Sequence, residues 1–262
     1  MKIHDFLNRK QQGKKISMLT CYDYWTACIL NKTEVDCLLV GDSLAMVVHG
    51  YDSTVHATVD MMATHIQAVR RGAPDKFIVG DMPFLSCSKG LGPAMDAVQA
   101  LMQAGASAVK IEGADHQVDI IRHIVEAGVP VMGHIGLTPQ SVHALGGHKV
   151  QGKSEEKAKA LCQAANRLAD AGCFSLVMEC VPMKLASGIS HNLSIPVIGI
   201  GAGPGVDGQV LVLQDLIGAD TEFKPRFLRH YAQCGTLLEQ VVNQYHQDVT
   251  DVSFPALSES YQ

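Results

Sequence analysis

The sequence has no Cys-x-x-Cys pair, although it contains eight cysteines. Most of them lie inside apolar segments, as Cys37, Cys162, Cys173 and Cys180 do. Cysteines in such positions usually act as small hydrophobic side chains in a reducing compartment. We therefore expect free thiols rather than a disulfide framework.

Long apolar runs are also missing, and no stretch approaches the length that crosses a bilayer. The first twelve residues carry charges throughout and contain no apolar segment of the signal-peptide kind. Basic residues are scattered, with Lys14-Lys15 and Arg70-Arg71 as the densest pairs, and the net charge is −5. We expect a cytoplasmic protein that binds neither membranes nor nucleic acid.

Two nucleotide-binding motifs are absent. No Gly-x-Gly-x-x-Gly follows the first apolar run, which argues against an open doubly wound sheet. No Gly-x-x-x-x-Gly-Lys-Ser/Thr string occurs, so nucleotide hydrolysis has no support. The chain also lacks a low-complexity segment and a Pro/Ser-rich linker. We expect one domain over residues 1–262, with a C-terminal helical region from about 224.

What the chain does have is a repeated unit of apolar run, turn, amphipathic segment and glycine. A strand covered on both faces of a sheet is continuously apolar, so these runs predict buried parallel strands. We expect eight of them, at 16–21, 37–42, 77–81, 108–112, 131–135, 176–179, 197–200 and 210–213. Helical periodicity lies between most runs, for example over 58–71 and from Asp115 to Gly128. This order predicts an α/β fold, a (β/α)₈ TIM barrel.

Four of the apolar runs end in or carry a carboxylate, namely Asp42, Asp81, Glu112 and Glu179. Such a charge is costly unless it is paired, hydrated or bound to metal, and the carboxyl ends of barrel strands form the active-site face. Asp42, Asp81 and Glu112 make an all-oxygen set, which suits Mg²⁺. Taken singly, Asp42 could instead cap a helix, and Asp81, before Pro83, could shape a loop.

Lys110 and Glu112 are two residues apart, so strand alternation points both side chains into the barrel. We interpret them as part of the site. The alternative is an internal ion pair that only neutralises itself.

Glu179 follows Leu176-Val177-Met178, and a carboxyl group in so apolar a setting holds its proton more tightly, which suits a general base near neutral pH. The alternative for Glu179 is a carboxylate paired with an Arg or Lys.

His134 is either a residue that contacts the substrate or shuttles a proton, or a core histidine whose ring is hydrogen-bonded. The glycine-rich stretch 199–205 follows a late strand, where many barrels bind phosphate, but its glycines equally permit a tight turn.

Several unusual strings occur in order between about Lys15 and Phe227. They are Thr20-Cys21-Tyr22-Asp23-Tyr24, Val40-Gly41-Asp42-Ser43-Leu44, Ala68-Val69-Arg70-Arg71-Gly72-Ala73, Asp81-Met82-Pro83-Phe84, Val109-Lys110-Ile111-Glu112-Gly113, Gly133-His134-Ile135-Gly136-Leu137-Thr138-Pro139-Gln140-Ser141, Lys149-Val150-Gln151-Gly152, Glu179-Cys180-Val181-Pro182 and Ile198-Gly199-Ile200-Gly201-Ala202-Gly203. Through these strings the chain resembles the ketopantoate hydroxymethyltransferase family. It departs at Gln214, where family members often have His.

The resemblance implies a barrel of the phosphoenolpyruvate/pyruvate type, usually assembled as a homodecamer. It implies that three acids surround Mg²⁺, partly through water, that Glu179 accepts a proton, and that four side chains contact a 2-oxoacid. The expected catalytic residue is Glu179, and the expected metal ligands are Asp42, Asp81 and Glu112. The expected substrate-binding residues are Asp42, Ser43, Asp81 and Lys110, to which we add His134 because of its position in the sequence.

The implied reaction is hydroxymethyl transfer from methylene-tetrahydrofolate to 3-methyl-2-oxobutanoate (α-ketoisovalerate), giving 2-dehydropantoate (ketopantoate) through a Mg-stabilised enolate in pantothenate and coenzyme A biosynthesis. Two other classes stay open. One is a Mg²⁺-dependent lyase of the isocitrate lyase or phosphonopyruvate type, although this chain lacks the Lys-Lys-Cys-Gly-His string of many such lyases. The other is an inactive barrel that acts as a scaffold.

Overall fold

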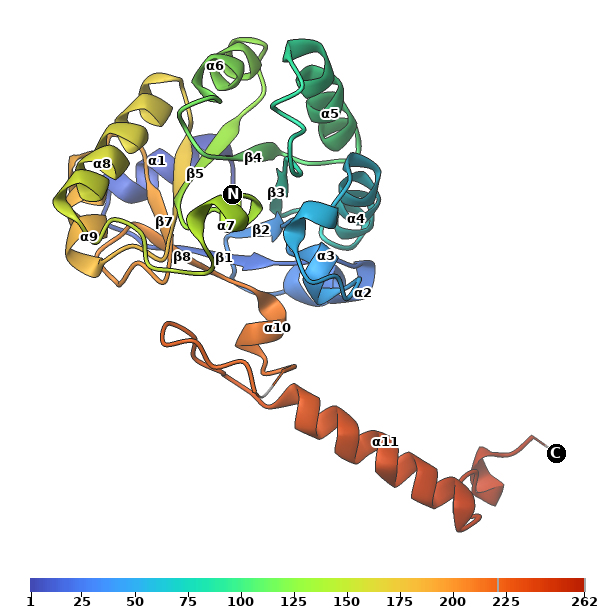
Figure 1. Ribbon diagram of the computed structural model, residues 1–262. Coiled ribbons are helices and arrows are strands. Elements are labelled where there is room, and N and C mark those ends of the chain that lie inside the picture. The colour runs from blue at the N-terminus through green and yellow to red at the C-terminus, as the bar shows by residue number, and fades with distance from the viewer. Residues whose placement is uncertain (221, 262) are drawn as a thin grey trace. The chain divides into compact units, whose positions relative to one another are not determined.

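Eight parallel strands form a closed barrel in chain order, and helices surround the strands (Figure 1). The structure is a computed structural model that describes residues 1–220 and 222–261. The strands are β1 (Ile16–Thr20), β2 (Cys37–Val40), β3 (Phe77–Asp81), β4 (Ala108–Glu112), β5 (Val131–Gly136), β6 (Ser175–Glu179), β7 (Val197–Ile200) and β8 (Gly208–Leu211). The predicted α/β barrel is confirmed.

Helices connect most of the strands. The longer ones are α1 (Ile3–Gln11), α2 (Tyr24–Leu30), α4 (Val59–Gly72), α5 (Leu91–Gln103), α6 (Val118–Glu126), α8 (Glu155–Asp170), α9 (Met183–Asn192) and α11 (Cys234–Thr250). Short helical turns are α3 (Leu44–Val47), η1 (Thr54–His56), η2 (Pro139–Ser141), α7 (Val142–Leu145), α10 (Leu213–Leu216) and η3 (Leu257–Glu259). None of the helices in the described part of the chain is both long and apolar enough to cross a bilayer.

Two of the helices begin directly after polar N-cap residues. Thr58 accepts a hydrogen bond from the backbone N–H of Met61 at the start of α4, and Ser154 accepts one from Lys157 at the start of α8. Such caps satisfy amides that the first turn leaves without partners. The local sequence therefore fixes where these two helices begin.

Several predicted boundaries are wrong; β2, for example, ends at Val40 rather than at 42, and the largest differences are at β8 and α6. β8 covers Gly208–Leu211 rather than 210–213, because Gly208 pairs with Ile16 so closely that a Cβ there would lie 2.4 Å from the Ile16 carbonyl oxygen. α6 begins at Val118 rather than at Asp115, and Asp115 instead forms an ion pair with Arg167 on α8. Both corrections depend on contacts with residues far away in the chain.

The barrel interior is filled by alternate side chains of the strands. The buried cluster comprises Ile16, Met18, Cys37, Leu39, Phe77, Val79, Ala108, Met132, Val177, Ile198 and Val210. Phe6 of α1 joins this cluster, with its ring centroid 5.2 Å from that of Phe77 and 4.9 Å from that of Phe174. α1 therefore closes the amino-terminal end of the barrel with apolar contacts.

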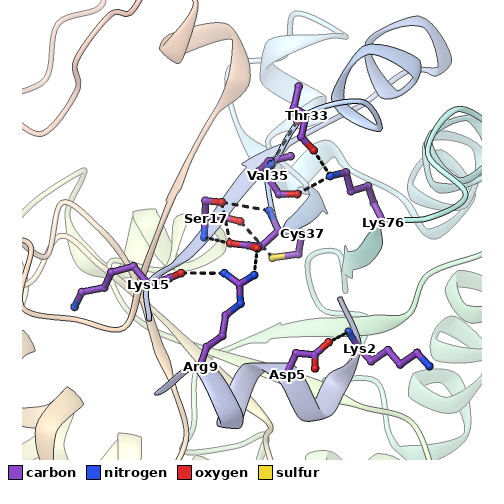
Figure 2. Close-up of polar contacts among 10 residues, drawn as sticks. Lys2, Asp5, Arg9, Lys15, Ser17, Thr33, Val35, Cys37 and Lys76 are labelled. Carbon is purple, nitrogen blue, oxygen red and sulfur yellow. Dashed lines mark hydrogen bonds and ion pairs between the residues drawn. The ribbon is translucent and has the colours of Figure 1, made fainter. Parts of the chain in front are cut away.

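Polar contacts tie down the chain at the same end (Figure 2). Arg9 of α1 forms an ion pair of 2.6 Å with Asp36, whose carboxylate also accepts hydrogen bonds from the backbone and hydroxyl of Ser17. Lys76 donates to the carbonyl oxygen of Thr33 at 2.6 Å. Interactions at the amino-terminal face of such barrels usually serve stability, which leaves chemistry to the opposite face.

Residue contacts divide the chain into two compact units, Met1–Leu211 and Val212–Gln262. The first unit contains all eight strands. In the second unit, the predicted start of the helical region near Lys224 falls in the irregular segment between α10 and α11. The single-domain organisation over 1–262 stays a prediction.

Candidate active site

The structure brings the expected site residues to the carboxyl ends of the strands. Asp81, Glu112 and Glu179 are the last residues of β3, β4 and β6, and His134 lies in β5. Asp42 follows β2 by two residues. Because the strands are parallel and the barrel is closed, these ends share one rim.

Lys110 lies among the carboxylates. Its ammonium nitrogen is 3.1 Å from Asp81 Oδ1 and 3.9 Å from Glu112 Oε1, and its side chain is only 5% exposed. Burial lowers the pKa of Lys110, but the charges of Asp81, Glu112 and Asp42 outweigh burial and raise it above the usual value. Lys110 is therefore a fixed cation inside the rim, and it shares the inward direction of Glu112 that strand alternation predicts.

His134 bridges two acids. Its Nδ1 is 3.2 Å from Glu112 Oε1, and its Nε2 is 3.3 Å from Glu179 Oε2. Burial and the Lys110 charge lower the pKa of His134, but Glu112 and then Glu179 outweigh them and raise this pKa to about 8. The histidine couples the β4 carboxylate to the β6 carboxylate.

Asp42 and Asp81 are nearly buried and lie next to one another. The backbone N–H of Asp42 donates to Asp81 Oδ2 at 3.0 Å. Burial, and then the negative charges of Asp81 and Glu112, raise the pKa of Asp42 well above its usual value. Burial also raises the pKa of Asp81, although Lys110 opposes it. This part of the rim carries more negative than positive charge.

Glu112 differs from the two aspartates in its surroundings. Burial raises its pKa, but the hydrogen bond and charge of His134, followed by Lys110, outweigh burial and bring the pKa below the usual value. Glu112 therefore stays an anion that holds His134 and Lys110 in place.

Ser43 and Glu179 complete the expected set. The Ser43 hydroxyl is 2.8 Å from the hydroxyl of Tyr22, which is fully buried. The Glu179 side chain is 18% exposed. Cys180, directly after it, has a φ of +50°, a left-handed backbone conformation that costs about 1 kcal/mol or more in a residue other than glycine. This turn changes the chain direction immediately after Glu179.

Gln140 belongs to the site, although it was not among the expected site residues. Its side-chain Nε2 donates to Asp42 Oδ2 at 2.8 Å and to the Met82 carbonyl oxygen at 2.9 Å, and its backbone N–H donates to Glu112 Oε2 at 3.1 Å. The string Thr138-Pro139-Gln140-Ser141 was the available signal, since it begins two residues after the end of β5.

Within residues 1–220 and 222–261, no three His, Cys, Asp or Glu side chains are arranged to hold a metal ion directly. Lys110 lies between Asp81 and Glu112. The three expected metal ligands are nevertheless connected, because Asp42 contacts Asp81 and Gln140 contacts both Asp42 and Glu112. A cation at this rim would therefore contact one or two carboxylates and water, as Mg²⁺ commonly does.

A family model described as ketopantoate hydroxymethyltransferase matches residues 1–257 of this chain. The chain belongs to the ketopantoate hydroxymethyltransferase family. Membership in the ketopantoate hydroxymethyltransferase family makes the chain an enzyme of the transferase class. It also confirms the resemblance carried by the strings along the sequence.

Two relatives in the ketopantoate hydroxymethyltransferase family match along 97% or more of their lengths, and both are named 3-methyl-2-oxobutanoate hydroxymethyltransferase. The protein from Coxiella burnetii (strain CbuG_Q212) is 55% identical over 258 residues, which cover 98% of this chain and 97% of the relative. The protein from Legionella pneumophila (strain Lens) is 54% identical over 262 residues, which cover 100% of both chains.

Solved structures share the barrel at low sequence identity. A 2,3-dimethylmalate lyase, described as a member of the PEP mutase/isocitrate lyase superfamily, has a TM-score of 0.61 and 15% identity, and the match covers 99% of this chain and 91% of the lyase. A phosphonopyruvate hydrolase in complex with oxalate and Mg²⁺ has a TM-score of 0.65 and 10% identity, with coverage of 99% and 93%. The fold is that of this group of barrels.

Proposed function

We propose that this chain transfers a hydroxymethyl group from methylene-tetrahydrofolate to 3-methyl-2-oxobutanoate and forms 2-dehydropantoate. Relatives at 54–55% identity bear the name of a 3-methyl-2-oxobutanoate hydroxymethyltransferase. The observation that carries the proposal is the position of Glu179 beside His134, on the rim where Asp42, Asp81 and Glu112 also lie.

The donor set fits a hard divalent cation. Three acids with buried side chains lie around a single lysine, and the pKa of Asp42 is raised by burial and by the other two acids, so an added cation would offset repulsion. Mg²⁺ held by Asp42 and Asp81, with Glu112 acting through water, would polarise the ketone and stabilise negative charge on its oxygen. The related barrel that holds oxalate and Mg²⁺ supports this choice of metal and of a chelating acid.

Glu179 acts as the general base in this proposal. It removes the proton from the branched carbon beside the ketone, and the resulting carbanion equivalent forms a C–C bond to the one-carbon unit. The C–N bonds that hold this unit to the folate break, a water molecule supplies the hydroxyl oxygen, and tetrahydrofolate leaves. His134 Nε2 lies 3.3 Å from Glu179 Oε2, so a protonated imidazole would attract this carboxylate and hold it at the rim. A positioned base of this kind contributes about 10²–10⁴-fold to a rate.

Lys110 and Ser43 bind the 2-oxoacid together with Asp42, Asp81 and His134. Lys110 is a permanent cation and offsets the carboxylate charge of the substrate as well as that of the acids. The Ser43 hydroxyl is held by Tyr22, so it meets the substrate in a fixed direction.

We further infer the biological setting. The reaction belongs to pantothenate and coenzyme A biosynthesis, in the cytoplasm. The partners are a small 2-oxoacid and a reduced folate, without nucleic acid or membrane, and the enzyme acts as a homodecamer.

The deciding assay supplies 3-methyl-2-oxobutanoate, methylene-tetrahydrofolate and Mg²⁺ and measures 2-dehydropantoate. Formation of that product supports the proposal. Cleavage of a different 2-oxoacid derivative would identify a lyase instead, and the absence of any turnover would favour a scaffold protein.

A second experiment tests the base. In Glu179→Gln, exchange of deuterium into the branched carbon of the oxoacid should fall about 10²-fold or more, while binding of Mg²⁺ and the oxoacid persists. Nuclear magnetic resonance of the substrate in D₂O measures the exchange. Unchanged exchange would remove Glu179 from this role.

A further inference from the structure

Gln140 connects three strand ends through one side chain and one peptide group. It lies in η2, after β5, and its amide nitrogen donates to Asp42 Oδ2 (2.8 Å) after β2 and to the Met82 carbonyl (2.9 Å) after β3. Its backbone N–H donates to Glu112 Oε2 (3.1 Å) at the end of β4. Both carboxylates belong to the set that we propose for the cation.

The orientation of the Gln140 amide follows from chemistry. Its two neighbours are a carbonyl oxygen, which only accepts, and an oxygen of Asp42, which also only accepts in the ionised form that binds a cation. The NH₂ group has two hydrogens to donate, whereas the amide oxygen in this place would face two acceptors. The NH₂ group therefore occupies this position and uses both of its hydrogens.

The start of the same loop is held by the strand that carries the base. The backbone N–H of Leu137, three residues before Gln140, donates to the Glu179 carbonyl oxygen at 2.9 Å. Pro139 restricts the backbone directly before Gln140. The loop from Leu137 to Gln140 thus joins the end of β6 to Asp42 after β2 and to Glu112 at the end of β4.

We propose that Gln140 is a positioning residue that holds Asp42 and Glu112 in the orientation needed for divalent-cation binding. The inference rests on the proposed function, in which these carboxylates bind the cation. Gln140 engages one oxygen of each carboxylate, Oδ2 of Asp42 and Oε2 of Glu112, and so fixes the direction of the other oxygen. Hydrogen-bond partners of metal ligands commonly change metal affinity about 10–100-fold when they are removed.

The test measures Mn²⁺ binding to the full-length protein without substrate, using the electron paramagnetic resonance signal of free Mn²⁺. Gln140→Met keeps the side-chain length and removes the donor, so its Mn²⁺ affinity should fall about 10–100-fold. Gln151→Met is the matched control, because the Gln151 amide donates to the Lys149 carbonyl rather than to a carboxylate. Circular dichroism verifies that each variant is folded.

Gln140→Asn provides a second variant, since it keeps the amide but is one methylene too short to hold the same contacts. It should weaken Mn²⁺ binding several-fold, even if Gln140→Met does not fold. A steady-state comparison adds a kinetic readout, in which excess Mg²⁺ should restore much of the kcat of Gln140→Asn.

Wild-type affinity for Mn²⁺ in folded Gln140→Met or Gln140→Asn would overturn this inference and leave the proposed function intact. Equal weakening in Gln151→Met would also overturn it, because the effect would then not depend on the contact with Asp42. Failure of the wild-type protein to bind Mn²⁺ would refute the cation site itself, and the inference with it. Selective weakening at Gln140 supports the inference.

Discussion

The individual residues of the candidate site are mostly charged side chains that are buried or nearly buried. Asp42, Asp81 and Glu112 place three acids around Lys110, and His134 completes the set with a pKa raised to about 8. Buried ions of this kind cost stability unless they are paired. Each residue in the cluster therefore affects both folding and ligand binding, and its substitution should be tested for both.

Asp81→Asn should weaken binding of Mg²⁺ and of 3-methyl-2-oxobutanoate. The change removes a negative charge next to Lys110 and leaves the shape nearly unchanged, so we expect about a 100-fold loss of Mg²⁺ affinity, or roughly 2.7 kcal/mol. Isothermal titration calorimetry measures both ligands. The control is Asp119→Asn on α6, where the carboxylate is exposed; normal chelation in the Asp81 variant would dismiss its assignment as a metal ligand.

His134 should make stability depend on pH. Its pKa is raised from 6.5 to about 8 in the folded protein, so the folded state binds the proton more tightly than the unfolded state. The stabilising contribution, roughly 2 kcal/mol, is complete below about pH 6.5 and is lost as pH rises through 8.

Urea unfolding in the presence of a chelator measures this effect. Between pH 6 and pH 9 the wild type should lose about 2 kcal/mol more than His134→Gln, which cannot titrate there. Identical pH dependence of the two proteins would contradict the expectation.

At the scale of elements, β5 and β6 meet where the site is formed. Gly136 ends β5 with a φ of +96°, and a Cβ at this position would lie 2.2 Å from the carbonyl oxygen of Glu179. The glycine allows β5 to approach β6, at Glu179, more closely than any other residue could. Element geometry, and not only side-chain identity, places Glu179.

Gly136→Ala should therefore destabilise the protein by at least about 2 kcal/mol, through backbone strain and through the clash with β6. Gly128→Ala is the control: its φ is +91°, but nothing lies within 4 Å of the added methyl group, so about 1 kcal/mol is expected. Equilibrium unfolding in urea compares them. Equal losses in the two variants would show that the contact with Glu179 has no effect.

At the scale of the whole molecule, closure of the barrel is the central feature of the first unit. β1 pairs with β2 on one side and with β8 on the other, so the first and last strands of the sheet have no unpaired edge.

In the second unit, α11 exposes a series of apolar side chains, Leu237, Leu238, Val241, Val242 and Tyr245. Apolar surfaces of this kind commonly contact another protein surface, so α11 is the element on which the proposed homodecamer can be tested.

Sedimentation velocity should give an assembly of about 280 kDa, ten copies of the 28.1 kDa chain. Leu238→Glu combined with Val241→Glu should reduce this mass, because charge would replace apolar surface on α11. The exposed Lys32 provides a control, Lys32→Glu, outside α11. A single species near 28 kDa for the wild type would refute the assembly.

Sequence periodicity alone determined the fold class and most of the strands. Continuous apolar runs predict buried parallel strands, since both faces of each strand are covered. Acids at the ends of these runs predict the position of the site, because a charge there needs a partner or a bound cation. Alternation also predicted that Lys110 and Glu112 point the same way. These properties are local in the chain, so they can be read without coordinates.

Only the tertiary structure decided the contacts across the barrel. The bridge of His134 between Glu112 and Glu179, the Gln140 contacts to Asp42 and Glu112, and the register of β8 depend on strands distant in sequence. Hydrogen bonds and ion pairs act over a few ångströms, and closure of the barrel sets which groups come within that range. The sequence specifies which charged and hydrogen-bonding side chains the site contains, while the fold specifies which of them contact one another.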